Sequence, residues 1–197
     1  MLGRRKGLSF TRRRKRIETS AIQAGLFWAG ECILAFAIGC VLVFYFMSRL
    51  TCVGQAMEPS INSGNSVLVN RFSYAMTTPK RGDVIVFKPN GNKNAHYYMR
   101  RVIGVPGDKI QVKDGFVYVN GDLYETGIGN EQMDYVGLAE EELKVGSDEY
   151  FVLGDNRNVS EDSRSADIGN VKKSDIYGKA WFVAYPWDNF GFVTSVK

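Results

Sequence analysis

The sequence predicts an antiparallel all-β domain behind one amino-terminal transmembrane helix, and three observations support this. First, residues 24–47 are apolar except for Glu31, and these 24 residues exceed the roughly 20 that a helix needs to cross a bilayer. Second, the chain then changes to short, β-branched segments separated by Gly, Pro, Asn and Asp. Third, 45% hydrophobic and 23% charged residues in a chain of 197 are typical of one folded domain, which excludes a disordered chain.

The positive charge of the chain is concentrated at the amino terminus. Eight Lys or Arg and no acidic residue lie between Arg4 and Arg16, whereas the whole chain carries a net charge of only +4. A basic segment before an apolar run is typical of the cytoplasmic flank of a membrane helix, so it predicts the lipid bilayer as a partner and not a nucleic acid. A cleavable signal is excluded because its apolar region spans only roughly 7–15 residues. We therefore expect a basic cytoplasmic tail (1–20), a transmembrane helix (21–48) and an extracytoplasmic β domain (49–197).

Seven segments after the helix have the alternation and the β-branched residues of strands. They are residues 66–70, 83–87, 97–103, 109–112, 116–119, 149–153 and 180–184. The pairs Asp114-Gly115 and Asn120-Gly121 are signals for two-residue hairpin turns. Only residues 137–143 have a helical pattern in this part of the chain. The pattern predicts one antiparallel β domain with tight turns and no internal repeat.

The cysteines and the histidine predict neither a metal site nor a disulfide framework. Cys32 and Cys40 lie inside the apolar run, and only Cys52 follows it. Their spacing matches no metal-ligand pattern, and an odd number of cysteines with one histidine, His96, forms no cluster. We expect no cofactor and no disulfide within a monomer.

Four stretches of the β domain have motif-like composition. They are residues 54–59 (GQAMEP), 81–87 (RGDVIVF), 98–108 (YMRRVIGVPGD) and 154–164 (GDNRNVSEDSR). In this order behind one membrane helix they closely resemble the type I signal peptidases, and the resemblance covers about residues 20–188. It implies the fold of these serine–lysine proteases, in the compact form typical of Gram-positive bacteria, because the large cap insertion of some Gram-negative members is absent.

The resemblance fails at the two residues that carry the chemistry of the family. Its first stretch reads GxSM, with a nucleophilic serine, and its third reads YxKRVIGxPGD, with a general-base lysine. Here the two positions hold Ala56 and Arg100. A methyl group cannot attack a carbonyl, and a guanidinium stays protonated at any working pH. Losing one member of such a unit costs about as much as losing all of it, up to roughly 10⁶ in rate. The neighbouring Ser60, Ser63 and Ser66 have no base within the motif.

The residues that support the lysine in the family are retained. Ser160, Asp162 and Arg164 match the serine, aspartate and arginine that the resemblance places around it. We expect Asp162 to lie close to both Arg100 and Arg164 in a charge-assisted cluster. The alternative interpretation is that residues 154–164 form only a tight polar turn, in which Gly154 and Asp155 serve the turn itself.

The resemblance also implies a groove that binds an extended peptide by strand addition. Met57 and Pro59 match family positions there, and Val84, Ile85 and Val86 fall on a strand that resembles a pocket-lining one. The alternative for each apolar residue is simply the hydrophobic core.

Aromatic residues gather near the carboxyl end of the chain. They are Trp181, Tyr185, Trp187 and Phe190, with Pro186 among them. Such residues suit a membrane interface, but we expect them to pack in the core.

We therefore expect a membrane-anchored signal peptidase homologue without peptidase activity. The expected partner is an exported preprotein or a pilin-like surface protein, because some degenerate members of the family serve surface-pilus biogenesis, and the expected role is that of an assembly factor or chaperone. One alternative is an active signal peptidase that removes signal peptides from secreted preproteins with other residues. Another is a passive subunit in a complex with an active paralogue.

Overall fold

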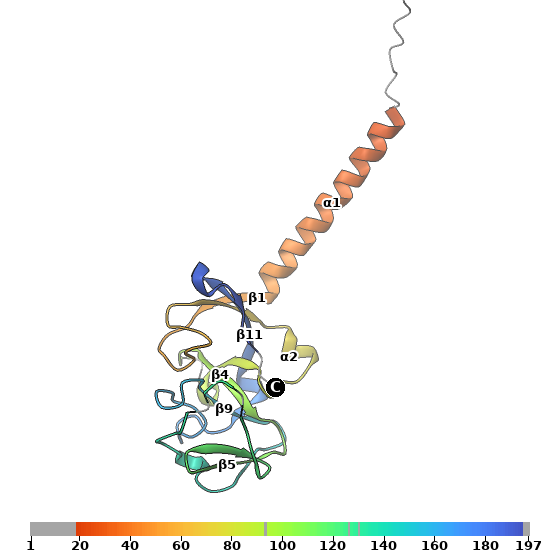
Figure 1. The fold of residues 1–197 in the computed structure, drawn as a ribbon. Helices are drawn as coiled ribbons and strands as arrows, with labels where there is room; N and C mark the ends of the chain where they lie inside the picture. The colour runs from red at the N-terminus through yellow and green to blue at the C-terminus, as the bar shows by residue number, and fades with distance from the viewer. Residues whose placement is uncertain (1–18, 93, 126, 130, 195–197) are drawn as a thin grey trace, which may run out of the picture. The chain divides into compact units, whose positions relative to one another are not determined.

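The computed structural model describes residues 19–194 except 93, 126 and 130, and it divides into two compact units, residues 1–43 and 44–197. The first unit contributes one helix, α1 (Thr19–Phe46), drawn as a single long helix in Figure 1. Within it Ile22–Val41 is long and apolar enough to cross a membrane. Large side chains on this helix such as Phe27 and Trp28 are exposed, as expected of a helix that lipid surrounds. The predicted basic segment between Arg4 and Arg16 lies outside the described residues.

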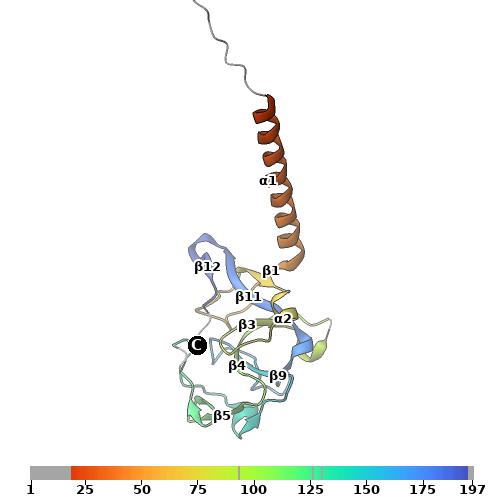
Figure 2. The same cartoon turned by 90° about the vertical axis from the view of Figure 1, so that its right-hand side faces the viewer.

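The second unit contains two antiparallel sheets. In the larger sheet the strands follow the order β1-β2-β11-β3-β4-β9-β10, with β12 paired to β11. Its strands are β1 (Met47–Thr51), β2 (Ser66–Asn70), β3 (Val84–Phe87), β4 (Tyr98–Gly104), β9 (Glu149–Leu153), β10 (Val171–Lys172), β11 (Ile176–Tyr185) and β12 (Gly191–Phe192). The smaller sheet, in the order β7-β6-β5-β8, consists of β5 (Lys109–Lys113), β6 (Phe116–Val119), β7 (Asp122–Leu123) and β8 (Leu143–Lys144). Figures 1 and 2 show β5 at the opposite end of this unit from β1 and β11.

Short helical turns connect the strands. They are α2 (Ser73–Met76) and the 3₁₀ turns η1 (Pro89–Gly91), η2 (Gly137–Ala139), η3 (Lys173–Asp175) and η4 (Trp187–Asn189). The antiparallel all-β fold is thus confirmed, and each of the seven predicted strands is present. Both predicted hairpin turns are also confirmed, because Asp114 and Gly115, and likewise Asn120 and Gly121, have the positive φ angles that such turns require.

Two local predictions are wrong. Residues 137–143 form no regular helix: Gly137 has a φ of 52°, η2 ends at Ala139, and Leu143 pairs with Ile110 of β5. The helix predicted to reach residue 48 ends at Phe46, because Met47 and Ser48 pair with β2. The helix propensity of seven residues is small, and the strand pairing of the backbone outweighs it.

Strand β3 separates two hydrophobic clusters of the larger sheet. Val84 and Val86 pack in one cluster with Met57 and Met99, whereas Ile85 packs in the cluster on the other face. This division follows from the period of two in a strand. A third cluster lies at the smaller sheet and includes Ile103, Ile110 and Leu153. The first cluster is the one that carries the candidate site.

Asp108 fastens the turn between β4 and β5. Its carboxylate accepts hydrogen bonds from Val105 N (2.8 Å), Arg81 Nη2 (2.7 Å) and Asn120 Nδ2 (2.8 Å). Burial acts to raise the pKa of Asp108, but these three hydrogen bonds and the charge of Arg81 outweigh it, so the pKa is lowered. A lowered folded-state pKa means that the carboxylate stabilises the fold above the unfolded pKa of about 3.9 and loses this effect at lower pH.

Asp108→Asn is therefore expected to lower the free energy of unfolding at pH 7 and to flatten its decline as the pH falls below about 4. Urea unfolding of the full chain in detergent micelles between pH 3 and pH 7 measures both effects. Asp122→Asn, at an exposed position on β7, is the matched control and should keep the wild-type pH dependence. An unchanged acid decline in Asp108→Asn would contradict the prediction.

Candidate functional site

A pocket of about 480 Å³ opens between the loop that follows β1 and strand β4. Its wall includes Leu50 from β1, Val53, Ala56 and Met57 from the loop, Tyr97 from the segment before β4, and Arg100 from β4. Two backbone bonds, Cys52 N to Asn65 O (2.8 Å) and Gly64 N to Cys52 O (2.9 Å), close the base of the loop. Met57 is 1% exposed and packs into the cluster of Val84 and Met99. A loop anchored at its base and by a buried side chain holds its pocket-facing residues in fixed positions.

Ala56 lies where the loop meets the 154–164 turn. Ala56 lines the pocket, and its carbonyl accepts a hydrogen bond from Asn156 N (3.1 Å). Gly154 makes the close approach possible, because a Cβ there would lie 2.6 Å from the carbonyl oxygen of Ala56 and 2.3 Å from the Cβ of Ser160. The structure thus places Ala56 and Ser160 around Gly154.

Arg100 lies on β4 and is 7% exposed. Its Nε donates to the carbonyl oxygen of Glu161 (2.7 Å) and its Nη1 to the carbonyl oxygen of Met99 (2.7 Å). Its Cζ lies 5.2 Å from the centre of the Tyr98 ring, within the range of a cation–π contact. Burial lowers the pKa of Arg100, and the nearby carboxylate of Asp162 opposes this effect. The guanidinium still remains protonated at neutral pH.

Asp162 is the centre of the buried turn. It accepts hydrogen bonds from Arg164 Nε (2.8 Å), Arg164 Nη2 (2.9 Å) and Gly154 N (3.1 Å), and Ser160 Oγ also donates to it. Arg164 is therefore in direct contact with Asp162, whereas Arg100 lies near enough for its charge to interact with Asp162 but forms no direct ion pair with it. The physical reason is that the oxygens of Asp162 are already occupied, and that two nitrogens of Arg100 donate to backbone carbonyls.

Arg101 and Asp155 form a second buried ion pair, which the motif comparison missed. Arg101 Nε and Nη2 bind the two carboxylate oxygens of Asp155 at 2.7 and 2.6 Å, and both side chains are 1% exposed. Arg101 also donates to Ser60 Oγ (3.2 Å). Asp155 is thus more than a turn residue, because it joins β4 to the turn. The signal in the sequence was strand alternation, which places Arg100 and Arg101 on opposite faces of β4.

The residues predicted to bind peptide are dispersed. Met57 lines the pocket, and Pro59 is exposed on the loop beyond it. Val84 and Val86 lie in the core cluster behind Met57, and Ile85 faces the opposite cluster, so these three side chains are not part of the pocket wall. Conversely, Cys52, His96 and Tyr97 line the pocket and were not predicted.

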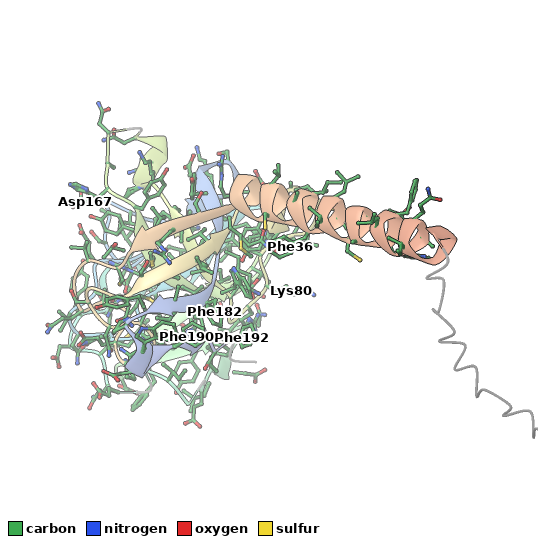
Figure 3. The ribbon with its side chains drawn as sticks, turned by 90° about the horizontal axis from the view of Figure 1, so that it is seen from above. Phe36, Lys80, Asp167, Phe182, Phe190 and Phe192 are labelled. Atoms are coloured by element: carbon green, nitrogen blue, oxygen red, sulfur yellow. The ribbon has the colours of Figure 1, made fainter. Side chains whose placement is uncertain are left out.

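The aromatic cluster near the carboxyl end was predicted to pack in the core, and this is wrong for Tyr185, Trp187 and Phe190, whereas Trp181 is half-buried. Trp187 is 76% exposed, Phe190 52% and Phe192 75%. Figure 3 shows Phe182, Phe190 and Phe192 gathered side by side, and their rings contact one another with centroids 4.8 to 5.2 Å apart. The pairing of β11 with β12, in which Phe182 lies opposite Phe192, brings these rings together.

An apolar helix followed by an antiparallel β domain, in which the 54–59 loop, β4 and the 154–164 turn meet at one place, defines the class of type I signal peptidases and their relatives. Comparison with known families agrees: the model described as "Signal peptidase, peptidase S26" matches residues 26–185. The chain belongs to the signal peptidase, peptidase S26 family.

Individual relatives are similar over most of their length. Signal peptidase IB of Staphylococcus aureus (strain MRSA252) is 33% identical over 181 residues, which are 82% of this chain and 92% of that protein. Signal peptidase I P of Bacillus subtilis subsp. natto is 30% identical over 169 residues, 82% and 89% of the two chains. A crystal structure of a signal peptidase I from Enterococcus faecalis V583 is 30% identical, covers 52% of this chain and 97% of that chain, and has a TM-score of 0.41.

Proposed function

We propose that this member of the family is a binding protein without peptidase activity. One observation carries the proposal: the pocket at the catalytic position of the family has Ala56 and Arg100 in its wall, and neither side chain can act as nucleophile or base. Binding a polypeptide requires the pocket and its walls, but it requires no hydroxyl. Loss of the chemistry is therefore compatible with retained binding.

Ser160, which lies beside Gly154, does not supply the missing nucleophile in this proposal. Ser160 Oγ donates to the carboxylate of Asp162, which already accepts two hydrogen bonds from Arg164. A carboxylate whose oxygens already accept hydrogen bonds from a guanidinium is poorly placed to receive the proton of a serine. The guanidinium of Arg100, which stands in place of the lysine, cannot take up a proton at any working pH.

In this proposal α1 anchors the protein in the plasma membrane. The basic residues before α1 favour a cytoplasmic amino terminus, so the β domain from about residue 49 lies outside. Its ligand is then a segment of an exported preprotein or of a pilin-like surface protein. The role is that of an assembly factor or chaperone, with pilus biogenesis as one setting.

Binding is tested with the full chain in liposomes and an unfolded exported protein. The wild type is expected to retain this polypeptide on co-flotation, and Ala56→Trp, which fills the pocket without changing a buried core residue, is expected to lose roughly tenfold or more in affinity. Leu123→Trp, at an exposed position on β7, is the matched control and should bind as the wild type does. Equal binding by all three proteins, or by none, would contradict the proposal.

A second candidate is processing of preproteins by this chain. The observation in its favour is that relatives with 30% and 33% identity are signal peptidases by name. It requires a nucleophile other than residue 56, and a cleavage assay separates the two candidates.

A further inference from the structure

Arg100 is a buried cation that lacks an ion pair. It is 7% exposed, and within the described part of the chain no carboxylate oxygen lies within 4.0 Å of its guanidinium nitrogens. Arg101 and Arg164 differ, because each is 1% exposed and binds Asp155 or Asp162 through two nitrogens. Arg157, 5% exposed, likewise forms no ion pair with the described residues, but it does not line this pocket. Withdrawing a guanidinium from water is unfavourable unless an anion compensates for the lost hydration.

The guanidinium of Arg100 also has an unused donor group. Nε and Nη1 donate to the carbonyls of Glu161 and Met99, whereas Nη2 donates to no residue among those that the structure describes. Arg100 contributes to the pocket wall, and none of the described residues in that wall is acidic. A fixed positive charge with free N–H groups is therefore available to a ligand in a pocket that is otherwise mainly apolar.

We propose that the pocket takes the carboxyl terminus of an extended polypeptide, whose terminal carboxylate binds the guanidinium of Arg100. This inference rests on the proposed function, since it names the ligand of the same pocket. A carboxylate matches the planar guanidinium in both charge and geometry. Small apolar side chains upstream of the terminus would contact Leu50, Val53 and Met57.

The position of the cation favours a terminus over an acidic side chain. Two of its nitrogens are fixed against backbone carbonyls, so the group cannot move out to meet a ligand at the surface. A chain that ends in the pocket needs to enter it only once. A chain that continues past an acidic side chain must enter and leave a space of about 480 Å³.

The test compares two forms of one peptide, Ala-Gln-Ala-Ala, with a free or an amidated carboxyl terminus and a fluorophore at the amino end. Anisotropy with the full chain in detergent micelles is expected to show that the free acid binds roughly tenfold or more tightly, since a charge-assisted hydrogen bond is present only in that form. Arg100→Gln should remove this preference. Lys144→Gln, which removes an exposed charge on β8, should keep it.

The possible failures are distinguishable. Equal affinity of the wild type for the acid and the amide would overturn the carboxylate inference and leave the binding function standing. Binding of neither form would contradict both. If an amidated peptide with an internal aspartate bound as tightly as the free acid, the assignment to a chain terminus would be overturned. The comparison of acid with amide uses the wild type alone, so it holds even if Arg100→Gln folds poorly.

Discussion

A preprotein is expected to stay uncut by the wild-type protein and to be cut by the variant that carries Ala56→Ser and Arg100→Lys together. The serine supplies the missing hydroxyl in the wall of the pocket, and the lysine supplies a base. Burial already lowers the pKa of Arg100, and the same burial would act on a lysine in its place. Because an ordinary lysine pKa is about 10.4, this lowering brings the neutral, proton-accepting form toward the working range.

The single variants are the controls for this restoration. Ala56→Ser alone has a hydroxyl without a base, and Arg100→Lys alone has a base without a nucleophile, so each should remain close to the wild type. Residues that act as a unit are strongly non-additive, and the double variant can exceed either single variant by up to roughly 10⁶ in rate. Its rate should rise with pH as Lys at position 100 loses its proton.

The assay uses the full chain in detergent or liposomes with a preprotein substrate. Cleavage by the wild type would contradict the proposal that it lacks peptidase activity. Ser160→Ala and Ser60→Ala would then identify the nucleophile. Failure of the double variant to cut, with its fold intact, would mean that the pocket no longer presents a peptide bond to residue 56.

Removing one partner of the buried Arg101–Asp155 pair is expected to lower the free energy of unfolding by about 3–5 kcal/mol. Both side chains are 1% exposed, so Arg101→Met leaves the carboxylate of Asp155 buried and without its ion-pair partner. The same change also removes hydrogen bonds to the carbonyl of Gly82 (2.8 Å) and to Ser60. Chemical denaturation of the full chain in detergent micelles measures the loss.

Two comparisons show whether burial is the cause. Lys109→Met breaks an ion pair whose side chains are 54% and 52% exposed, and it should change stability by about 1 kcal/mol or less. The double variant Arg101→Met plus Asp155→Leu should recover part of the loss, because the carboxylate of Asp155 is then no longer buried without its partner. If Arg101→Met and Lys109→Met lowered the free energy of unfolding equally, burial of the ion pair would not be the cause of the loss.

The sequence predicted which segments form the site better than it predicted the contacts between their side chains. The 54–59 loop, β4 and the 154–164 turn were identified from their motifs, and the structure brings all three together. The sequence predicted the pair of Arg164 with Asp162, but it specified neither the pair of Arg101 with Asp155 nor the lack of an ion pair at Arg100. Arg100, Arg101 and Arg164 compete for Asp155 and Asp162, and the outcome depends on strand alternation and on which oxygens are already occupied.

The composition of the chain also did not predict which apolar side chains are exposed. Trp187 and Phe190 were expected in the core because large aromatic rings are usually buried. They lie on a hairpin at the edge of the sheet, where the rings contact each other. Val84, Ile85 and Val86 were expected beside the ligand, and the sheet instead divides them between two cores.

By itself, the sequence determined the apolar helix, the antiparallel β class, the two hairpin turns and the identity of the residues at positions 56 and 100. These features depend on local patterns or on single side chains, which are read directly from the order of residues. Only the tertiary structure decided the pocket, the pairing of Arg101 with Asp155, and the lack of an ion pair at Arg100. Burial and competition for hydrogen bonds arise between segments about 50 or more residues apart, as between Arg101 and Asp155, and no local pattern encodes them.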